Sequence, residues 1–143
     1  MIAKITCSGG LFVAKDTQRF LFLLRAKGKT AGTWGFVGGK KELVDITPYD
    51  TLIREINEEI GTPPSIIKPV PLEWYSSNDD MFFYHTYAII VEKEFIPKLN
   101  DEHYGYCWVN LNQWPRPLHQ GVRNTLGNKT TRSKIQTILD VIR

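Results

Sequence analysis

The segment Arg54–Gly61 constrains the fold of this 143-residue chain most, because its pattern predicts a helix that carries three clustered carboxylates. The preceding Thr47–Asp50 is typical of a helix start, with threonine as the N-cap, proline in the first turn and an acid at the capping-box position. Gly61, followed by Pro63 and Pro64, marks the end of the helix. The sequence therefore predicts one helix between residues 47 and 61.

The predicted helix has two different faces. Its apolar stripe consists of Leu52, Ile53, Ile56 and Ile60. Glu55, Glu58 and Glu59 stand at i, i+3 and i+4 and share another face, where their like charges repel. A hard cation such as Mg²⁺ or Mn²⁺ would turn that repulsion into binding. A solvated acidic face is the alternative, but Gly38-Gly39-Lys40 upstream favours a site.

These residues resemble the Nudix box, G-x5-E-x7-R-E-U-x-E-E-x-G-U, in which U is a bulky apolar residue. Arg54–Gly61 matches the second half at every specified position, whereas Thr62 stands where an apolar residue is usual. The first half departs from the pattern, because Asp45 replaces glutamate and eight residues rather than seven separate it from Arg54. One extra residue in the turn at 45–47 accounts for the spacing and leaves the role of Asp45 open.

The segment Trp34–Lys40 with Glu42 is similar to the W-x-F-P-G-G-K-x-E sequence of the MutT-like branch, with Val37 in place of proline. The resemblance implies an α/β fold, a Nudix-like α/β/α sandwich with a mixed sheet. We expect residues 1–143 to form one Nudix-like hydrolase domain, a length sufficient for a core.

The resemblance implies that Glu55, Glu58 and Glu59 bind Mg²⁺ or Mn²⁺, often together with the carbonyl of Gly39. It also makes Glu58 a candidate general base. The metal would position the phosphates and lower the pKa of bound water. The clustered glutamates should raise one another's pKa when no metal is bound.

The resemblance implies a structural role for Arg54, which we group with Glu58 and Glu102 as the residues expected to support catalysis. Its planar fork pairs with a box carboxylate and fixes the helix against the preceding loop. In this chain the partner is Asp45 or Glu42, and we favour Asp45.

A further catalytic carboxylate is expected from Leu99–His103, which resembles the variable loop of the family. We select Glu102, as a second metal ligand or base, because an acid beside histidine just before a strand recurs in relatives. A plain hydrophilic loop is the alternative, and His103 is expected to be a structural or surface residue.

Substrate contacts are expected around the glycine pair. Arg25, at the end of the second predicted strand, is a candidate phosphate contact, and Lys40 belongs to a short basic cluster. Gly38 and Gly39 would let the backbone approach metal and phosphate. Trp34 and Phe36, with Trp108, are candidates for stacking on a base, and core positions are the alternative for each.

Composition excludes several other classes of protein. Apolar residues make up 42% and charged residues 23%, as in ordinary globular domains. The net charge of +3 favours small anions but is too small to indicate nucleic-acid binding. Cys7 and Cys107 lack zinc-site spacing, and free thiols fit a reducing compartment. We find no signal-peptide or membrane-spanning segment and expect a cytoplasmic protein.

The remaining elements follow from apolar patterns. Strands are predicted at 3–14, with a bend or bulge at Gly9-Gly10, at 19–26 and at 34–37, the last leading into a glycine turn. A hairpin is predicted from 66–75 and 81–92. Another strand follows at 104–109, then a turn region at 111–117. A second helix begins at Thr131, with a core-facing stripe from Ile135 to Ile142.

The leading functional hypothesis is hydrolysis of a nucleoside or deoxynucleoside triphosphate to a monophosphate and pyrophosphate. Hydrolysis of ADP-ribose or of a dinucleoside polyphosphate is the first alternative. A Nudix-fold nucleotide-binding module without turnover is the second, which retention of all three helix glutamates disfavours. The expected partner is the nucleotide alone, with no nucleic acid and no membrane, and a homodimer is an option that the sequence leaves open.

Overall fold

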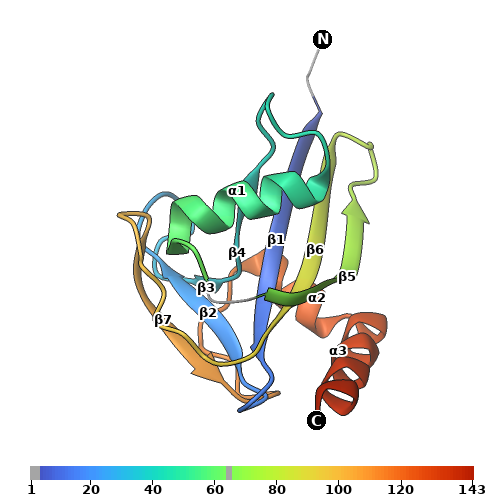
Figure 1. Cartoon of the computed structure of the whole chain (residues 1–143). Helices are drawn as coiled ribbons and strands as arrows, with labels where there is room; N and C mark the ends of the chain where they lie inside the picture. Colours follow the sequence, from blue (N-terminus) through green and yellow to red (C-terminus); the bar gives the residue numbers. More distant parts are fainter. Residues whose placement is uncertain (1–3, 64–65) are drawn as a thin grey trace.

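The computed structural model describes residues 4–63 and 66–143, and within them the chain forms seven strands and three helices (Figure 1). The strands are β1 (Ile5–Ala14), β2 (Phe20–Arg25), β3 (Trp34–Gly35), β4 (Val37–Lys40), β5 (Ile66–Ser76), β6 (Phe82–Val91) and β7 (His103–Val109). The helices are α1 (Pro48–Ile60), α2 (Gln120–Gly127) and α3 (Lys129–Ile142). Ala3 and Pro64, parts of the predicted first strand and of the predicted helix stop, lie outside the described residues.

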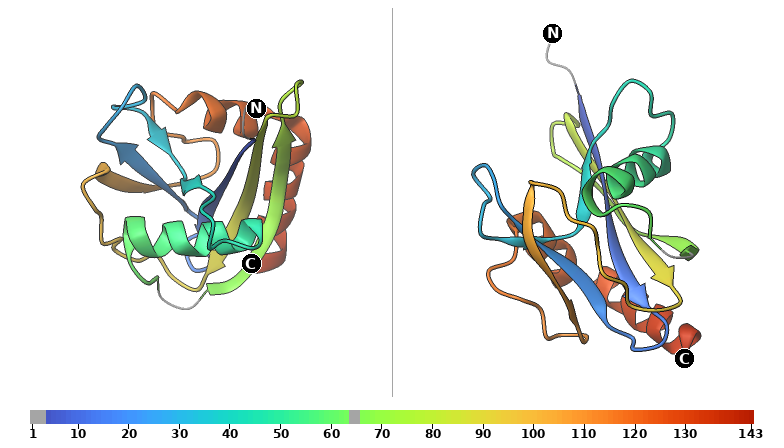
Figure 2. Two further views of the ribbon diagram at one scale, coloured as in Figure 1. Left: turned by 90° about the horizontal axis from the view of Figure 1, so that it is seen from above. Right: turned by 60° about the vertical axis from the view of Figure 1, so that its left-hand side comes forward.

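One mixed sheet lies between two helical layers. Its strand order is β3-β2-β1-β6-β5, with β4 paired to β1 and β7 paired to β2. Strands β1 and β6 run parallel, and the other pairs are antiparallel. Helix α1 covers one face of the sheet, and α2 and α3 cover the other (Figure 2). The predicted α/β/α sandwich and the predicted hairpin of β5 and β6 are therefore confirmed.

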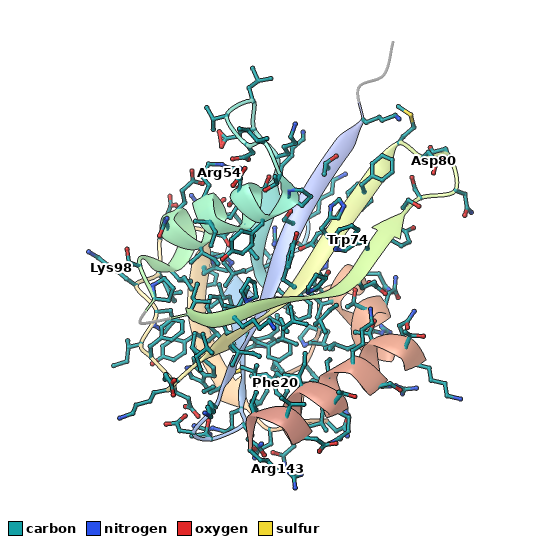
Figure 3. The ribbon with its side chains drawn as sticks, turned by 45° about the vertical axis from the view of Figure 1, so that its right-hand side comes forward. Phe20, Arg54, Trp74, Asp80, Lys98 and Arg143 are labelled. Carbon is teal, nitrogen blue, oxygen red and sulfur yellow. The ribbon has the colours of Figure 1, made fainter. Side chains whose placement is uncertain are left out.

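The core is divided by the sheet, because successive side chains of a strand point to opposite faces. In β1, Leu11 and Val13 pack with α2 and α3, whereas Phe12 and Ala14 pack with α1. Side chains fill the space on both sides of the sheet, and Phe20 lies on the side of α3 (Figure 3). Such burial on both faces explains the dense apolar run of β1 and β2.

Helix α1 begins and ends where the capping pattern predicts. The side chain of Thr47 accepts a hydrogen bond from the Asp50 N–H at 3.1 Å, and the Asp50 carboxylate accepts one from the Thr47 N–H at 2.9 Å. Gly61 caps the C-terminus with a φ of 77°, a backbone conformation that favours glycine. The N-terminal hydrogen bonds come from neighbours in sequence, whereas the carbonyls of Glu58 and Ile60 at the C-terminal end accept hydrogen bonds from Asn100 and Lys98.

The glycine pairs do not form the predicted bulge and turn. Gly9 and Gly10 lie inside an uninterrupted parallel register with β6, and Gly38 and Gly39 belong to strand β4. A Cβ atom at Gly9 would clash with the Tyr84 hydroxyl, and one at Gly38 would clash with the backbone of Ser8. These glycines therefore allow neighbouring groups to pack closely against the strand backbone, and they do not change the direction of the chain.

Helix α2 was missed from sequence, and α3 begins at Lys129 rather than at Thr131. Helix α2 has only eight residues, with glycine at positions 121 and 127, so it is too short to be stable alone and depends on packing against the core. In α3 the side chain of Asn128 accepts the Thr131 N–H, which makes Asn128 the N-cap. The predicted apolar stripe faces the core as expected. Among the described residues, no helix combines the length and apolar character needed to cross a membrane.

Candidate functional site

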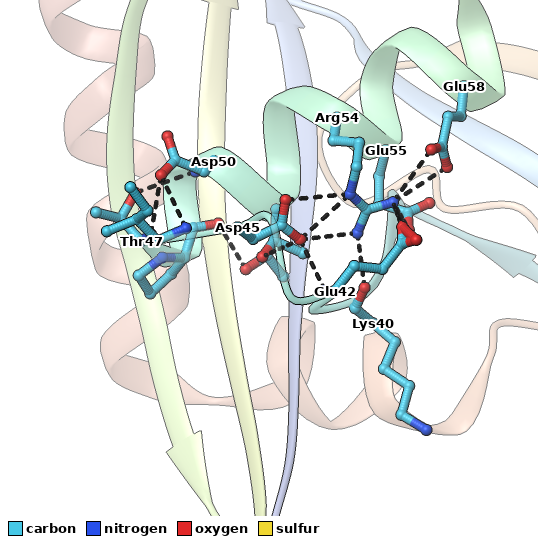
Figure 4. A network of polar contacts seen from close by, with 12 residues as sticks. Lys40, Glu42, Asp45, Thr47, Asp50, Arg54, Glu55 and Glu58 are labelled. Atoms are coloured by element: carbon cyan, nitrogen blue, oxygen red, sulfur yellow. Dashed lines mark hydrogen bonds and ion pairs between the residues drawn. The ribbon is translucent and has the colours of Figure 1, made fainter.

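Arg54, in the middle of α1, is the centre of a polar network between the helix and the preceding loop (Figure 4). Its Nη2 donates to Asp45 Oδ2 at 2.9 Å and to the Lys40 carbonyl at 2.8 Å, and its Nε donates to Asp45 at 3.1 Å. Its Nη1 lies 2.6 Å from Glu42, 3.0 Å from Glu55 and 3.2 Å from Glu58. Asp45 and Glu42, which the sequence left as alternatives, are both partners.

Asp45 points inward although the loop around it points outward. Its side chain is almost fully buried, whereas Leu43, Val44 and Ile46 are exposed. Hydrogen bonds from Arg54, from the Glu42 N–H and from the Thr51 hydroxyl hold the pKa of Asp45 down, to about 2. The extra residue of the loop is accommodated at the surface, so the contact with Arg54 is kept.

Glu59 is the buried member of the three helix glutamates, with 5% of its surface exposed. Its Oε1 accepts the Gly38 N–H at 2.9 Å. Burial raises the pKa of Glu59 to about 8. The hydrogen bond from the Gly38 N–H lowers this pKa, and the negative charges of Glu55 and Glu102 raise it. The positive charge of Arg25 lowers it slightly. Mutual repulsion was predicted to raise the pKa, but loss of hydration is the larger cause.

Glu55 and Glu58 are less buried than Glu59. A Cβ atom added to Gly39 would lie 2.5 Å from the Glu55 carboxylate, so that carboxylate packs directly on the strand backbone. Burial also raises the pKa of Glu55, Arg54 opposes the rise, and Glu58 and Glu102 add to it. The side chain of Glu58 is 53% exposed and faces Arg54 and solvent.

The loop before β7, which carries Glu102, contacts the C-terminal half of α1. Asn100 Nδ2 donates to the Glu58 carbonyl at 3.0 Å and to Glu102 Oε2 at 3.3 Å. The charge of Glu102 adds to the rise in the pKa of both Glu55 and Glu59. His103 is buried, and its Nδ1 has no hydrogen-bond partner among the described residues.

The donor set fits a hard divalent cation in its chemistry. Carboxylate oxygens are the ligands that Mg²⁺ and Mn²⁺ prefer, and Glu59 and Glu55 hold negative charge at a cost that a cation would relieve. Within residues 4–63 and 66–143, no three acidic, histidine or cysteine side chains lie close enough together to hold a metal ion. The Arg54 guanidinium lies between Glu55 and Glu58, so cation binding requires side-chain movement there.

A cavity of about 520 Å³ lies on the other face of the sheet, between β5, β6 and α2. Its volume is within the range of small-molecule sites. It is lined by Phe36, Glu73, Tyr75, Phe82, Tyr84, Thr86, His119, Gln120, Gly121, Val122, Asn124, Thr125 and Asn128. The lining thus combines aromatic rings with amide, hydroxyl, imidazole and carboxylate groups.

Tyr84 and Arg25 connect the cavity with the carboxylates. Burial raises the pKa of Tyr84, the charges of Cys7, Glu59 and Glu55 add to the rise, and Arg25 opposes it. Burial lowers the pKa of His119, and Arg25 lowers it further. Arg25 is therefore close enough to influence both Glu59 and a cavity residue, and its Nε is held by the Thr30 hydroxyl at 2.6 Å.

The aromatic residues chosen from sequence divide between core and cavity. Phe36 is buried against Phe22 yet lines the cavity, so it forms a wall of the cavity. Trp34 packs on the core and pairs with the segment leading to α2. Trp108 is buried, and its Nε1 donates to the Phe95 carbonyl at 3.1 Å. The Lys40 side chain is exposed and points away from the Arg54 network (Figure 4).

Sequence reasoning missed Glu73, Tyr84 and His119. Glu73 and Tyr84 were assigned only to hairpin strands, and His119 follows the predicted turn region. The one usable signal was the spacing of Val122, Thr125 and Leu126, which are all buried and mark one face of α2. Recognition of that helix would have directed attention to His119, its N-cap, whose Nδ1 accepts the Gly121 N–H at 3.1 Å.

Comparison with known proteins adds independent observations. The family model described as the NUDIX domain matches residues 8–127. No curated protein matches the chain significantly in sequence.

Several solved structures share the fold. The NUDIX domain of Shewanella oneidensis NrtR, complexed with ADP ribose, superimposes with a TM-score of 0.73 at 15% identity over 94% of this chain and 90% of that one. A MutT NUDIX hydrolase from Burkholderia pseudomallei gives 0.64 at 23% identity, over 85% and 94% of the two chains. A MutT protein from Methanosarcina mazei Go1 gives 0.70 at 20% identity, over 92% and 96%. At such identities the likeness shows the fold alone.

Proposed function

The chain belongs to the Nudix family, whose enzymes hydrolyse pyrophosphate bonds, and we propose that it converts a nucleoside or deoxynucleoside triphosphate to the monophosphate and pyrophosphate. The observation that carries this proposal is that Glu55 and Glu59 of α1 both contact the glycine pair of β4: the Glu55 carboxylate packs on Gly39, and Glu59 accepts the Gly38 N–H. A site rich in carboxylates needs a divalent cation before it can accept an anionic substrate.

In this proposal Glu55, Glu58 and Glu59 hold Mg²⁺ or Mn²⁺, together with the carbonyl of Gly39. A bound cation supplies charge neutralisation on the phosphates and acidifies water. Glu58 and Glu102 are the candidates for accepting the proton of the attacking water, because both are solvent-accessible. Arg54 positions the helix against the loop through Asp45 rather than contacting the reacting atoms.

In this proposal the cavity binds the nucleoside of the substrate, and basic residues bind its phosphates. The aromatic walls of the cavity suit the nucleoside, and Arg25, whose charge influences the pKa of both Glu59 and His119, is the proposed contact of the phosphate chain. Lys40, exposed beside the glycine pair, would meet the outer phosphates. Gly38 leaves room for close backbone approach and directs its own N–H to Glu59.

ADP-ribose is the second candidate substrate. The ADP ribose complex of the Shewanella oneidensis NUDIX domain favours it, because that domain superimposes on most of this chain. A triphosphate remains the first choice, because the segment Trp34–Lys40 with Glu42 is similar to the sequence of the MutT-like branch.

A hydrolysis screen tests the proposal. The protein would be incubated with nucleoside triphosphates, ADP-ribose and dinucleoside polyphosphates, each with Mg²⁺, with Mn²⁺ or with EDTA, and the products identified by ³¹P NMR. We expect metal-dependent release of pyrophosphate and a nucleoside monophosphate. Preferential release of AMP and ribose 5-phosphate from ADP-ribose would overturn the substrate assignment.

The matched pair of variants is Glu58→Gln and Glu92→Gln. Glu92 is exposed, and no described residue hydrogen-bonds to its side chain. Loss of turnover in the first variant with full turnover in the second assigns the effect to the site. Equal turnover in both variants, or activity in excess EDTA, would exclude the proposed site.

A further inference from the structure

Glu73 is the one acidic residue among the described residues that line the cavity, and no lysine or arginine lies in that lining. It stands on the far face of the sheet from the α1 carboxylates. Glu73 is half-buried there, and a half-buried carboxylate needs polar partners.

A β-bulge places Glu73 on that face. Pro71 pairs with Tyr87 and Glu73 pairs with Thr86, so β5 advances two residues where β6 advances one. Leu72 packs in the core with α2 and α3, and Glu73 accepts a hydrogen bond from the Thr125 hydroxyl of α2 at 2.7 Å. Both neighbours thus face α2, although regular pleating would put them on opposite faces. Bulges that redirect a side chain are over-represented next to active sites.

The surroundings of Glu73 suit a flat ring. The aromatic residues of the lining are Phe36, Tyr75, Phe82 and Tyr84, and Asn124 and Asn128 add side-chain amides. The Thr125 hydroxyl occupies only one lone pair of the carboxylate, so both oxygens of Glu73 can still accept hydrogen bonds. The cavity therefore offers stacking walls together with a two-pronged acceptor.

An ionised carboxylate only accepts hydrogen bonds, which makes it selective among bases. Guanine presents the ring N1–H and the exocyclic amine side by side, so it can donate to both oxygens at once. Adenine and cytosine place a ring-nitrogen acceptor beside their amine, and uracil and thymine place a carbonyl on each side of their N–H. We propose that Glu73 reads the adjacent N–H donors of guanine and selects a guanine nucleotide as the substrate.

This assignment rests on the proposed hydrolysis, so its test measures binding as well as turnover. The full chain would be assayed for kcat and KM on GTP, dGTP, ITP, ATP and UTP with Mg²⁺. Binding of the α,β-methylene analogues of GTP and ATP would be measured by calorimetry. ITP keeps the N1–H and lacks the amine, which makes it the ligand-side control.

We expect kcat/KM for GTP to exceed that for ATP by on the order of 10- to 100-fold, the scale of one bidentate contact to a base. ITP should lie between them. Glu73→Gln should remove most of the GTP-to-ATP ratio through KM with kcat kept, because base contacts are made equally in the ground and transition states. Glu92→Gln should leave the ratio unchanged.

The ratio of two substrates within one preparation does not depend on the fraction of folded protein, so partial unfolding of Glu73→Gln cannot imitate the result. Hydrolysis without a guanine preference, or a preference that survives in Glu73→Gln, overturns the role of Glu73 and leaves the hydrolase proposal standing. Calorimetric selectivity for the guanine analogue, lost in Glu73→Gln, supports Glu73 even where no triphosphate is hydrolysed.

Discussion

The two faces of the central sheet are built in different ways. On the α1 face, the helix glutamates and Arg54 come from one segment of fewer than ten residues, and the network around them is ionic. On the α2 face, the cavity collects residues from β5, β6, α2 and the segment before β4, and most of its contacts are aromatic or neutral. In the proposed assignment, the residues for chemistry therefore come from one short segment, whereas the residues for selectivity are brought together by the fold.

The two faces should therefore respond differently to substitution. Changes on the α1 face should lower turnover of every nucleotide by the same factor, because they affect the reacting phosphates. Changes in the cavity should alter the ratio between nucleotides.

The largest effect is expected for Glu58→Gln. The variant keeps the size of the side chain and removes its charge, so kcat should fall about 100-fold or more, the scale of losing a positioned base or ligand. The GTP-to-ATP ratio should stay constant, and thermal melting should show an intact fold, since the lost ion pair with Arg54 is half-exposed and contributes little to stability. A changed base ratio would show that the two faces are not independent.

Arg54→Lys tests whether the ionic network holds the loop to α1. Lysine cannot reproduce the fork that reaches Asp45 and the Lys40 carbonyl, so the free energy of unfolding should fall by about 2 kcal/mol, the scale of losing hydrogen bonds between charged groups. Urea denaturation measures this loss. The control is Arg143→Lys, because Arg143 pairs with Asp140 at the exposed C-terminal end of α3, where an ion pair contributes little to stability. Equal stability of wild type and Arg54→Lys would contradict a structural role.

The pH dependence of the free energy of unfolding tests the same network through the ionisation of Asp45, the partner of Arg54. The pKa of Asp45 lies at about 2 in the folded protein, below its ordinary value of 3.8, because of Arg54 and the Glu42 N–H. A lowered folded-state pKa contributes stability that is complete above pH 4 and is lost as the pH falls toward 2. The stability difference between wild type and Asp45→Asn should therefore shrink over that window. A difference that stays constant from pH 6 to pH 2 would argue against an ionised Asp45.

Gly39→Ala tests the close packing of Glu55 on β4. The added methyl group would displace the Glu55 carboxylate, so turnover should fall about tenfold, with the Mg²⁺ concentration needed for half-activity rising, as expected for a ligand moved by a fraction of an ångström. Gly105→Ala is the matched control, because nothing lies within 4 Å of a Cβ added there. Similar activity in both glycine variants would separate Gly39 from the site.

The smallest effect is expected for Glu102→Gln. Glu102 lies on a loop beside the helix carboxylates, and we expect kcat to fall about fivefold while KM changes less, since the group would act on charge that develops in the transition state. Steady-state kinetics on the preferred nucleotide distinguish the two parameters. An unchanged kcat would remove Glu102 from the site.

The predicted elements show where sequence reasoning was sufficient. Helix α1, the hairpin of β5 and β6 and the strand β7 were located correctly, since capping residues and apolar periodicity act between near neighbours. The glycine pairs were misread as a bulge and a turn, because only the fold brings Tyr84 over Gly9 and Ser8 against Gly38. Helix α2 was missed, since its stability comes from distant core residues rather than from its own eight residues.

Helix geometry sets the capped helix, its three glutamates at i, i+3 and i+4 and the arginine just before them, so these features could be read from the residues alone. Long-range packing buries Glu59 while Glu58 remains in solvent, and it lets Arg54 reach Asp45 across the extra loop residue. Strand pairing in the fold adds the bulge that directs Glu73 into the cavity. Burial and charge environment depend on residues far away in the chain, so no local pattern can contain them.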